Sequence, residues 1–204
     1  MIKVIDDVLP AGLADQIEKD VTSESFSWYL LRDINKESLK IPRVVVDENT
    51  VNTIQLGHGV FDIRKELTKQ INSSYFGYSN TCVNFIINKL GWNDANLLRI
   101  KYNLLFNNSQ FKTSSYNTPH VDNEEKNSYA IIYYVNDSDG DTILFNERFD
   151  YEKNIVPKKL TINQKISPKK NRVLIFDGDI FHTSSNPILS EKRIVMNINV
   201  KKYE

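Results

Sequence analysis

From Leu97 onward the sequence consists mainly of short β-rich runs, and this feature constrains the fold most strongly. The runs are rich in branched and aromatic residues, and Asn, Asp, Gly, Pro and Ser turns separate them. Several short strands at short spacing are typical of a β-sandwich or a β-barrel. The runs cover residues 97–106, 128–136, 141–147, 159–166, 171–176 and 192–200.

The first half of the sequence predicts mostly helices. A short apolar segment, Ile2–Leu9, reads as a strand, and after Pro10 apolar residues recur at helical spacing through Val21. Helical patterns also cover residues 60–71 and 81–90, the second closed by Gly91. Because helices precede the strands rather than alternate with them, a parallel βαβ sheet is disfavoured. We predict a mainly β fold, a jelly-roll barrel over 97–204 braced by mostly helical support from 1–96.

Composition narrows the class of protein. A chain of 204 residues with 40 % hydrophobic content is sufficient for one domain, 1–204. Its 26 basic and 26 acidic residues balance, so no net positive charge attracts polyanions such as nucleic acids. The single cysteine excludes an internal disulfide and a thiolate zinc site. The sequence contains neither a membrane-spanning run nor a signal pattern, so we expect a cytoplasmic protein without a membrane partner. The cytoplasm of a phage-infected bacterium is included in this expectation.

The sequence His120-Val121-Asp122 and the distant His182 are candidate metal ligands. In extended backbone, residues i and i+2 point to the same face, so His120 and Asp122 can converge on one ion. His182 follows an apolar strand and can supply the third ligand. Two imidazoles and one carboxylate form the facial triad of non-haem iron(II) oxygenases, but zinc hydrolases use similar ligands, so the triad alone does not choose the reaction.

A His-x-Asp triplet also arises often by chance, so its context matters. Only three histidines are present, and two of them stand beside β-rich runs. The third, His58, has no acidic neighbour at ligand spacing and reads as an ordinary residue at a helix entry rather than a substrate contact.

Arg193 begins a run in which two faces alternate. Arg193, Val195, Asn197 and Asn199 share one face, and Ile194, Met196, Ile198 and Val200 form an apolar layer on the other. A planar guanidinium on the polar face suits bidentate binding of a carboxylate. A salt bridge at the rim of a barrel is the alternative interpretation.

Taken together, these residues resemble the iron(II)/2-oxoglutarate-dependent dioxygenases. The resemblance is to the prolyl 4-hydroxylase-like group and its short single-domain members from phage and marine microbial genomes. It runs in order along the second half of the chain and is weaker from VIDDVLP to SFSWYL. The matching blocks are LLRIKYNLLF, HVDN, AIIYYVN, DGDTILF, NRVLIFDGDIFH and NPILSEKRIVMNIN.

This resemblance implies a double-stranded β-helix (cupin-like) fold, bound Fe(II), 2-oxoglutarate as cosubstrate and O2. By position, His120, Asp122 and His182 would hold the iron, and Arg193 would bind the distal carboxylate of 2-oxoglutarate. One departure is Asp139-Gly140-Asp141, where many relatives have paired glycines. Four further positions would line the cosubstrate pocket: Tyr134, Tyr102, Thr142 and Asn197.

The implied reaction hydroxylates an unactivated C–H bond and releases succinate and CO2. A protein or peptide side chain is the first candidate substrate, with proline foremost. A nucleic-acid base or a small metabolite is the enzymatic alternative, and a non-catalytic jelly-roll binding or structural module is the alternative from another class. The loop 107–119 either borders the substrate entrance or is a disordered surface loop. The segment 153–172, with seven basic residues and no acidic one, either attracts an acidic partner or carries solvated lysines.

Overall fold

The computed structural model describes residues 1–31, 44–51, 53–64, 70–109, 111–122 and 127–202. These residues form ten strands and two helices. The helices are α1 (Ala11–Val21) and α2 (Phe76–Leu90). The strands are β1 (Ile2–Ile5), β2 (Tyr29–Leu31), β3 (Gln55–Asp62), β4 (Ala95–Phe106), β5 (Ser128–Tyr134), β6 (Thr142–Arg148), β7 (Ile162–Ile166), β8 (Arg172–Asp177), β9 (Ile180–Ser184) and β10 (Lys192–Lys202).

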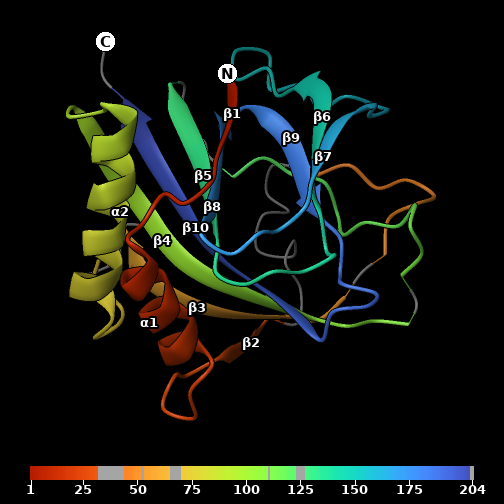
Figure 1. Ribbon diagram of the computed structural model, residues 1–204. Helices are drawn as coiled ribbons and strands as arrows, with labels where there is room; N and C mark the ends of the chain where they lie inside the picture. Colours follow the sequence, from red (N-terminus) through yellow and green to blue (C-terminus); the bar gives the residue numbers. More distant parts are fainter. Residues whose placement is uncertain (32–43, 52, 65–69, 110, 123–126, 203–204) are drawn as a thin grey trace.

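Two antiparallel sheets make up most of the structure. The larger has seven strands in the order β1-β8-β5-β10-β4-β3-β2, and the smaller has three in the order β7-β6-β9. Both helices lie against one face of the large sheet, and the small sheet lies on its other side (Figure 1). The prediction of a mainly β fold with flanking helices is therefore confirmed.

The alternation of β10 divides the core into two regions. Ile194, Met196, Ile198 and Val200 point toward the helices, where they pack with Ile17 of α1 and Ile86 of α2. Val195 points the other way and packs with Leu144, Ile166 and Ile180 of the small sheet. The face of β10 that carries Arg193, Asn197 and Asn199 therefore looks into the space between the two sheets.

One predicted helix is wrong. Residues 60–62 belong to β3, and Phe61 forms a bridge with Ile71, so the chain doubles back where the helical pattern was expected. The middle of the pattern, 65–69, lies outside the described residues. Pairing with β4 and complete burial of Val60 in the helix-side core outweigh the helical spacing, because tertiary packing overrides a weak local preference.

The other helices follow the sequence closely. α1 matches the pattern after Pro10, and α2 ends where Gly91 adopts φ 68° and accepts the left-handed conformation of a C-cap. α2 begins at Phe76 rather than Thr81. Strand β9 was not expected: His182, which follows the apolar run 171–176 in the sequence, lies within this additional strand.

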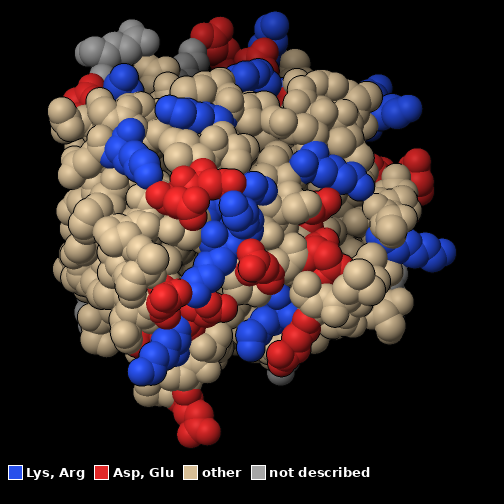
Figure 2. Space-filling model, in the orientation of Figure 1, with Lys and Arg blue, Asp and Glu red and all other residues tan. Residues whose placement is uncertain are grey.

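Several charged side chains of the basic segment form ion pairs on the surface. Within the basic segment 153–172, Lys169 and Arg172 form ion pairs with Asp6, while Lys170 pairs with Asp15 and Glu18 of α1. On the face in Figure 2, basic and acidic side chains lie side by side rather than in a patch of one sign. The structure thus favours surface ion pairs over an anion-binding strip. Neither helix of the described chain has the length and apolar character needed to cross a bilayer.

Candidate active site

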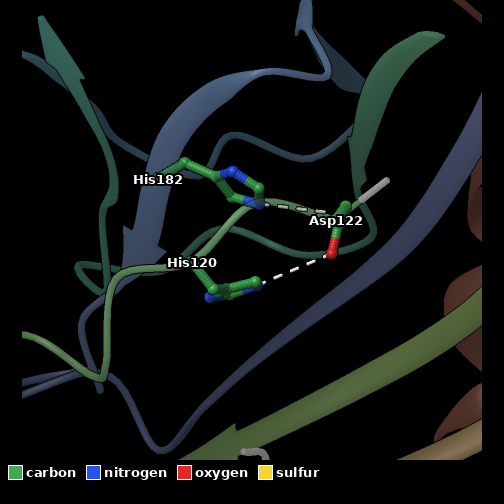
Figure 3. Close-up of side chains that lie close together, drawn as sticks. All are labelled: His120, Asp122 and His182. Atoms are coloured by element: carbon green, nitrogen blue, oxygen red, sulfur yellow. Dashed lines mark ion pairs between the residues drawn. The ribbon is translucent and has the colours of Figure 1, made fainter. Parts of the chain in front are cut away.

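The three candidate ligands lie together at the edge of the small sheet (Figure 3). His120 and His182 exchange two backbone hydrogen bonds, at 2.9 and 3.0 Å, so their side chains emerge next to each other. Nε2 of His120 lies 3.5 Å from Oδ1 of Asp122, and Nε2 of His182 lies 3.7 Å from Oδ2. One ligand atom from each residue falls within 4.8 Å of the other two, a spacing that a single metal ion can bridge.

The segment that delivers His120 is ordered by the small sheet. Asn117 donates its backbone N–H to the carbonyl of Ser184, and the Thr183 hydroxyl donates to the carbonyl of Asn117. Val121, between the two candidate ligands, points into an apolar cluster with Ile143 and Phe181 on the outer face of the small sheet. The second half of the loop 107–119 is thus held against the small sheet by hydrogen bonds. For these residues the structure disagrees with the alternative of a disordered loop.

Both imidazoles are oriented by backbone carbonyls. Nδ1 of His120 lies 3.0 Å from the carbonyl oxygen of Thr118, and Nδ1 of His182 lies 3.1 Å from that of Ile180. A carbonyl oxygen can only accept, so Nδ1 donates in each contact, and Nε2 is the nitrogen that faces Asp122. Burial, together with the nearby His120, lowers the pKa of His182 to about 4. His182 is therefore neutral near pH 7, the form that binds a metal.

Asp122 is held by amides and a guanidinium. Oδ2 accepts hydrogen bonds from Asn197, at 2.8 Å, and Asn199, at 3.2 Å. Oδ1 faces the Arg99 guanidinium at 3.9 Å. Burial alone would raise the pKa of Asp122, but His120, His182 and Arg99 outweigh it and hold the pKa well below its usual range. Asp122 is therefore a carboxylate at neutral pH.

Arg193 forms a second polar cluster farther along the same face of β10. Its Nε donates to the carbonyl of Gly140 at 2.7 Å, and its Nη2 donates to the Thr142 hydroxyl at 2.8 Å. The Tyr134 hydroxyl also donates to Thr142, at 2.7 Å, and the Arg193 guanidinium lies 5.8 Å from the centre of the Tyr134 ring. The structure thus brings together Arg193, Tyr134 and Thr142, as the sequence predicts.

The charge of Arg193 has no counter-ion in the described part of the chain. The residue is 3 % exposed, and no described carboxylate lies within 4 Å of its guanidinium. Burial lowers the pKa of Arg193, while Tyr134 and Asp141 partly oppose that effect. Burial also raises the pKa of Tyr134 to about 12, so its hydroxyl stays protonated and can donate. An unpaired buried guanidinium is costly, and a bound carboxylate would relieve that cost.

Two of the expected pocket residues lie elsewhere. Tyr102 is on the helix side of β4, where its hydroxyl contacts the Ser79 hydroxyl of α2 at 3.1 Å. It opposes Met196 in the ladder, so it faces away from Arg193. Asn197 lies on the inner face but donates to Asp122 instead of lining the Arg193 cluster. Its neighbour Asn199 and Arg99, which also contact Asp122, were missed by the sequence analysis.

His58 is not at a helix entry. It lies in β3 and is 6 % exposed, with its ring 4.4 Å from that of Phe26. Its two nitrogens contact the Ser27 carbonyl at 2.6 Å and the Ser73 hydroxyl at 2.7 Å. Both ring nitrogens are satisfied within the core, which makes His58 a structural residue.

Gly140 allows the Arg193 side chain to approach the β5–β6 turn. We predict that Gly140→Ala displaces the turn and this side chain and lowers the free energy of unfolding. A Cβ at Gly140 would lie 2.7 Å from the Ser185 carbonyl oxygen and 3.0 Å from Cδ of Arg193. The backbone must then shift, at a cost of about 1–3 kcal/mol in the free energy of unfolding. Urea unfolding checks the stability. Gly12→Ala is the matched control, because a Cβ there meets no atom within 4 Å; an equal loss in both variants would contradict the steric argument.

Asp139, in the turn that departs from the paired glycines of many relatives, anchors the loop that leads into β10. Its carboxylate accepts backbone hydrogen bonds from Ile188, Leu189 and Ser190, at 2.8–3.0 Å. Partial burial would raise the pKa of Asp139, but these N–H groups outweigh it and lower the pKa to about 2. The departure from paired glycines therefore adds an anchor for the loop before Arg193.

We predict that Asp139→Ala lowers the free energy of unfolding by about 1.5–3 kcal/mol at pH 7, as expected when hydrogen bonds to a charged acceptor are lost. Because folding lowers this pKa, the stabilisation is complete above the ordinary pKa near 4 and disappears as the pH falls to about 2. Urea unfolding from pH 7 to pH 2 should show the difference between wild type and variant shrinking over that interval. A pH-independent difference would assign the loss to packing instead.

Comparison with known proteins agrees with this geometry. Residues 106–201, slightly less than half of the chain, match the model of the 2OG-Fe(II) oxygenase superfamily. This range contains the three candidate ligands and Arg193. No curated protein matches the sequence.

Solved structures share the fold across nearly the whole chain. A prolyl hydroxylase from Trichoplax adhaerens, in complex with a hypoxia inducible factor peptide fragment, is 12 % identical with a TM-score of 0.55; the match covers 98 % of this chain and 83 % of that one. A Pseudomonas putida prolyl-4-hydroxylase is 12 % identical with a TM-score of 0.52, covering 99 % and 92 %. HygX from Streptomyces hygroscopicus, with nickel and 2-oxoglutarate bound, is 11 % identical with a TM-score of 0.57, covering 98 % and 82 %.

At these identities the structures establish a common fold, while the family match covers the strands that carry the site. Over residues 106–201 the chain matches the 2OG-Fe(II) oxygenase superfamily, and this match together with the shared fold indicates an enzyme that uses iron(II), 2-oxoglutarate and dioxygen.

Proposed function

We propose that this protein hydroxylates an unactivated C–H bond, with His120, Asp122 and His182 holding iron(II) and Arg193 holding the distal carboxylate of 2-oxoglutarate. The observation that carries the proposal is the buried Arg193 guanidinium, which has no counter-ion among the described residues. It shares one strand face with Asn197, which contacts Asp122. A dicarboxylate that binds a metal at one end and a guanidinium at the other fits this arrangement.

The donor set also fits iron(II). Two imidazole nitrogens and one carboxylate are ligands that non-haem iron accepts on one face, leaving other positions open. When bound, iron(II) with 2-oxoglutarate and dioxygen supplies the oxidising chemistry: one oxygen atom enters the C–H bond and the other enters succinate, with loss of CO2.

The protein's own residues orient and shield these groups. The carbonyls of Thr118 and Ile180 fix the two imidazoles, and Asn197 and Asn199 fix the Asp122 carboxylate. Thr142 connects Tyr134 to Arg193, so that the guanidinium is held before a ligand arrives. Such preorganisation reduces the ordering that binding and reaction require.

We further propose that 1–204 is one domain and that the two sheets form the double-stranded β-helix expected from the sequence. Coverage of 98 % or more of the chain by the Trichoplax and Pseudomonas structures supports this. The substrate we propose first is a protein or peptide side chain, with proline foremost, as in the Trichoplax complex with a peptide. A nucleic-acid base or small metabolite is the alternative to be assayed beside it.

Succinate formation tests the function. Protein loaded anaerobically with iron(II) and then exposed to oxygen should convert 2-oxoglutarate to succinate slowly without substrate and faster with a peptide that is hydroxylated. Quantifying succinate by mass spectrometry, with His120→Ala as control, measures this. Binding of iron and 2-oxoglutarate without any succinate, across prolyl peptides, oligonucleotides and small metabolites, would instead indicate a binding module.

A further inference from the structure

Arg99 is a second, half-buried arginine near the triad, and the proposed function assigns it no role. It opposes Asn199 in the β4–β10 ladder, so it faces the same space as Asp122. Its side chain is 17 % exposed, and Nη1 lies 3.9 Å from Oδ1 of Asp122, which is too long for a hydrogen bond. Within the described chain, no other polar group is a partner of this guanidinium. Among the described residues, the donors of Arg99 are therefore unused.

Asp122 alone cannot serve Arg99 and a metal. Oδ2 already accepts two amide hydrogen bonds, and Oδ1 lies 3.5 Å from Nε2 of His120, on the side of the candidate metal position. A divalent ion at the triad would share this single carboxylate with the guanidinium. A guanidinium that is only 17 % exposed and must share its one carboxylate with a metal ion is unfavourable without another anion.

The nearby Arg64 does not leave a similar set of donors. Its Nε and Nη2 bind the Asp62 carboxylate, each at 3.0 Å, and its Nη1 donates to the backbone oxygen of Asp122 at 2.9 Å. Asp62 is thereby occupied by Arg64. Among the described groups around Asp122, Arg99 is the cation whose hydrogen-bonding capacity remains open.

There is also room beside Arg99. The adjacent strand β3 carries an exposed glycine, Gly59, and a Cβ there would meet no atom within 4 Å. Gly59 pairs with Lys101, two residues from Arg99 on β4, whereas Arg99 itself pairs with Asp62. A ligand can therefore approach Arg99 from the side of Gly59, where β3 has no side chain.

We propose that Arg99 binds a carboxylate of the substrate, so that the enzyme acts on molecules with a carboxylate close to the carbon that is hydroxylated. An acidic side chain beside the target residue of a peptide would supply this group. The planar guanidinium suits it, because two parallel N–H donors match the two carboxylate oxygens. This inference rests on the proposed function, which places the metal at Asp122. The metal-proximal carboxylate of 2-oxoglutarate is the other source of the same chemistry, and the experiment separates the two.

The test uses zinc-loaded protein, which does not turn over, with 15N-labelled arginine and saturating 2-oxoglutarate. The Nε–Hε signal of Arg99 is identified by its absence in Arg99→Gln. Sodium acetate should shift that signal in a saturable way, and the neutral isostere acetamide should not. Arg99→Lys has no Arg99 signal, so its affinity for acetate is compared with wild type by isothermal titration calorimetry. It should be about tenfold weaker, because lysine keeps the charge but loses the paired donors. Acetate without effect, or with the same effect as acetamide, would overturn the proposal.

Arg148→Gln is the matched charge control, since Arg148 is held by Asp177 and Asp179. The acetate titration of the Arg99 signal should be unchanged in this variant. Melting temperatures of all variants identify any that fail to fold, in which case Arg99→Lys alone carries the comparison. If Arg148→Gln abolishes the acetate response, the binding site is not at Arg99.

A titration with 2-oxoglutarate alone identifies the source of the carboxylate. Arg99→Gln should leave the affinity for 2-oxoglutarate within about threefold of wild type, because the distal carboxylate belongs to Arg193 in the proposed function. If Arg99→Gln lowers the affinity for 2-oxoglutarate by about tenfold or more and the wild-type complex does not respond to acetate, Arg99 binds the cosubstrate. That result would overturn the substrate assignment. Failure of the wild type to bind zinc or 2-oxoglutarate would contradict the proposed function, whereas an intact complex indifferent to acetate contradicts the Arg99 proposal only.

Discussion

Replacing Arg193 by methionine should weaken the binding of 2-oxoglutarate by roughly 30-fold or more, while iron(II) still binds. The guanidinium is buried with no acidic partner among the described residues, so a cosubstrate carboxylate placed there would remain buried without its counter-charge in the variant. Breaking such a pair costs about 2–5 kcal/mol of binding free energy. Anaerobic titration of the iron-loaded protein, following the metal-to-ligand charge-transfer absorption, measures the affinity. Unchanged affinity would remove Arg193 from the site.

Tyr134→Phe is the graded control for this experiment. It removes one hydroxyl that donates to Thr142 but leaves the guanidinium, the threonine and the aromatic ring in place. The loss of one neutral hydrogen bond should reduce the affinity by about 0.5–1.5 kcal/mol, several-fold rather than 30-fold. A larger effect for Tyr134→Phe than for Arg193→Met would mean that the charge pair is not the main attachment.

Alanine at His120, Asp122 or His182 should abolish turnover and prevent stoichiometric binding of iron(II), which we expect at about one equivalent per wild-type chain. The ligand atoms of the three residues lie within 4.8 Å of one another, and each residue supplies one donor. Loss of a ligand should exceed the roughly 10- to 100-fold loss of metal affinity typical when an outer-shell partner is removed. Metal analysis of anaerobically loaded protein, with circular dichroism to check the fold, measures this.

Two control variants show how large the effect of losing a ligand is. His58→Gln changes the histidine that is satisfied by Ser27 and Ser73, so metal binding should survive. Asn197→Ala removes one of the two amides on Asp122 and should fall within the outer-shell range of about 10- to 100-fold. Wild-type metal content and activity in all three triad variants would refute the assignment. Zinc at the same residues would not, because zinc often competes successfully for such sites.

Strand β10 connects the two parts of the candidate site, which explains why one sequence run was so informative. Its inner face carries Arg193 at one end and Asn197 and Asn199 farther along, while its outer face is buried against the helices. A register shift of one residue would exchange the two faces and place the apolar layer in the site. Burial of the helix-side face therefore also fixes the position of the polar side chains.

The same alternation could have located two residues that the sequence analysis misplaced or missed. In β4, Ile100, Tyr102 and Leu104 share the helix-side face, and Arg99 belongs to the other one. The resemblance to the family placed Tyr102 in the pocket, but the apolar neighbours on its face indicate the core. The alternation argument applied to β10 works equally for β4. It would have placed Tyr102 in the core and Arg99 on the face of the site.

The sequence by itself determined the mainly β second half, helices α1 and α2, the i, i+2 spacing of His120 and Asp122, and the two faces of β10. These features depend on periodicity and turn residues, which are local properties of the chain. Only the tertiary structure decided that residues 55–62 form β3, that His182 lies in β9 opposite His120, and that two asparagines and Arg99 surround Asp122. Each of these depends on pairing between segments far apart in the sequence, and the partner of a strand is not encoded in its own pattern.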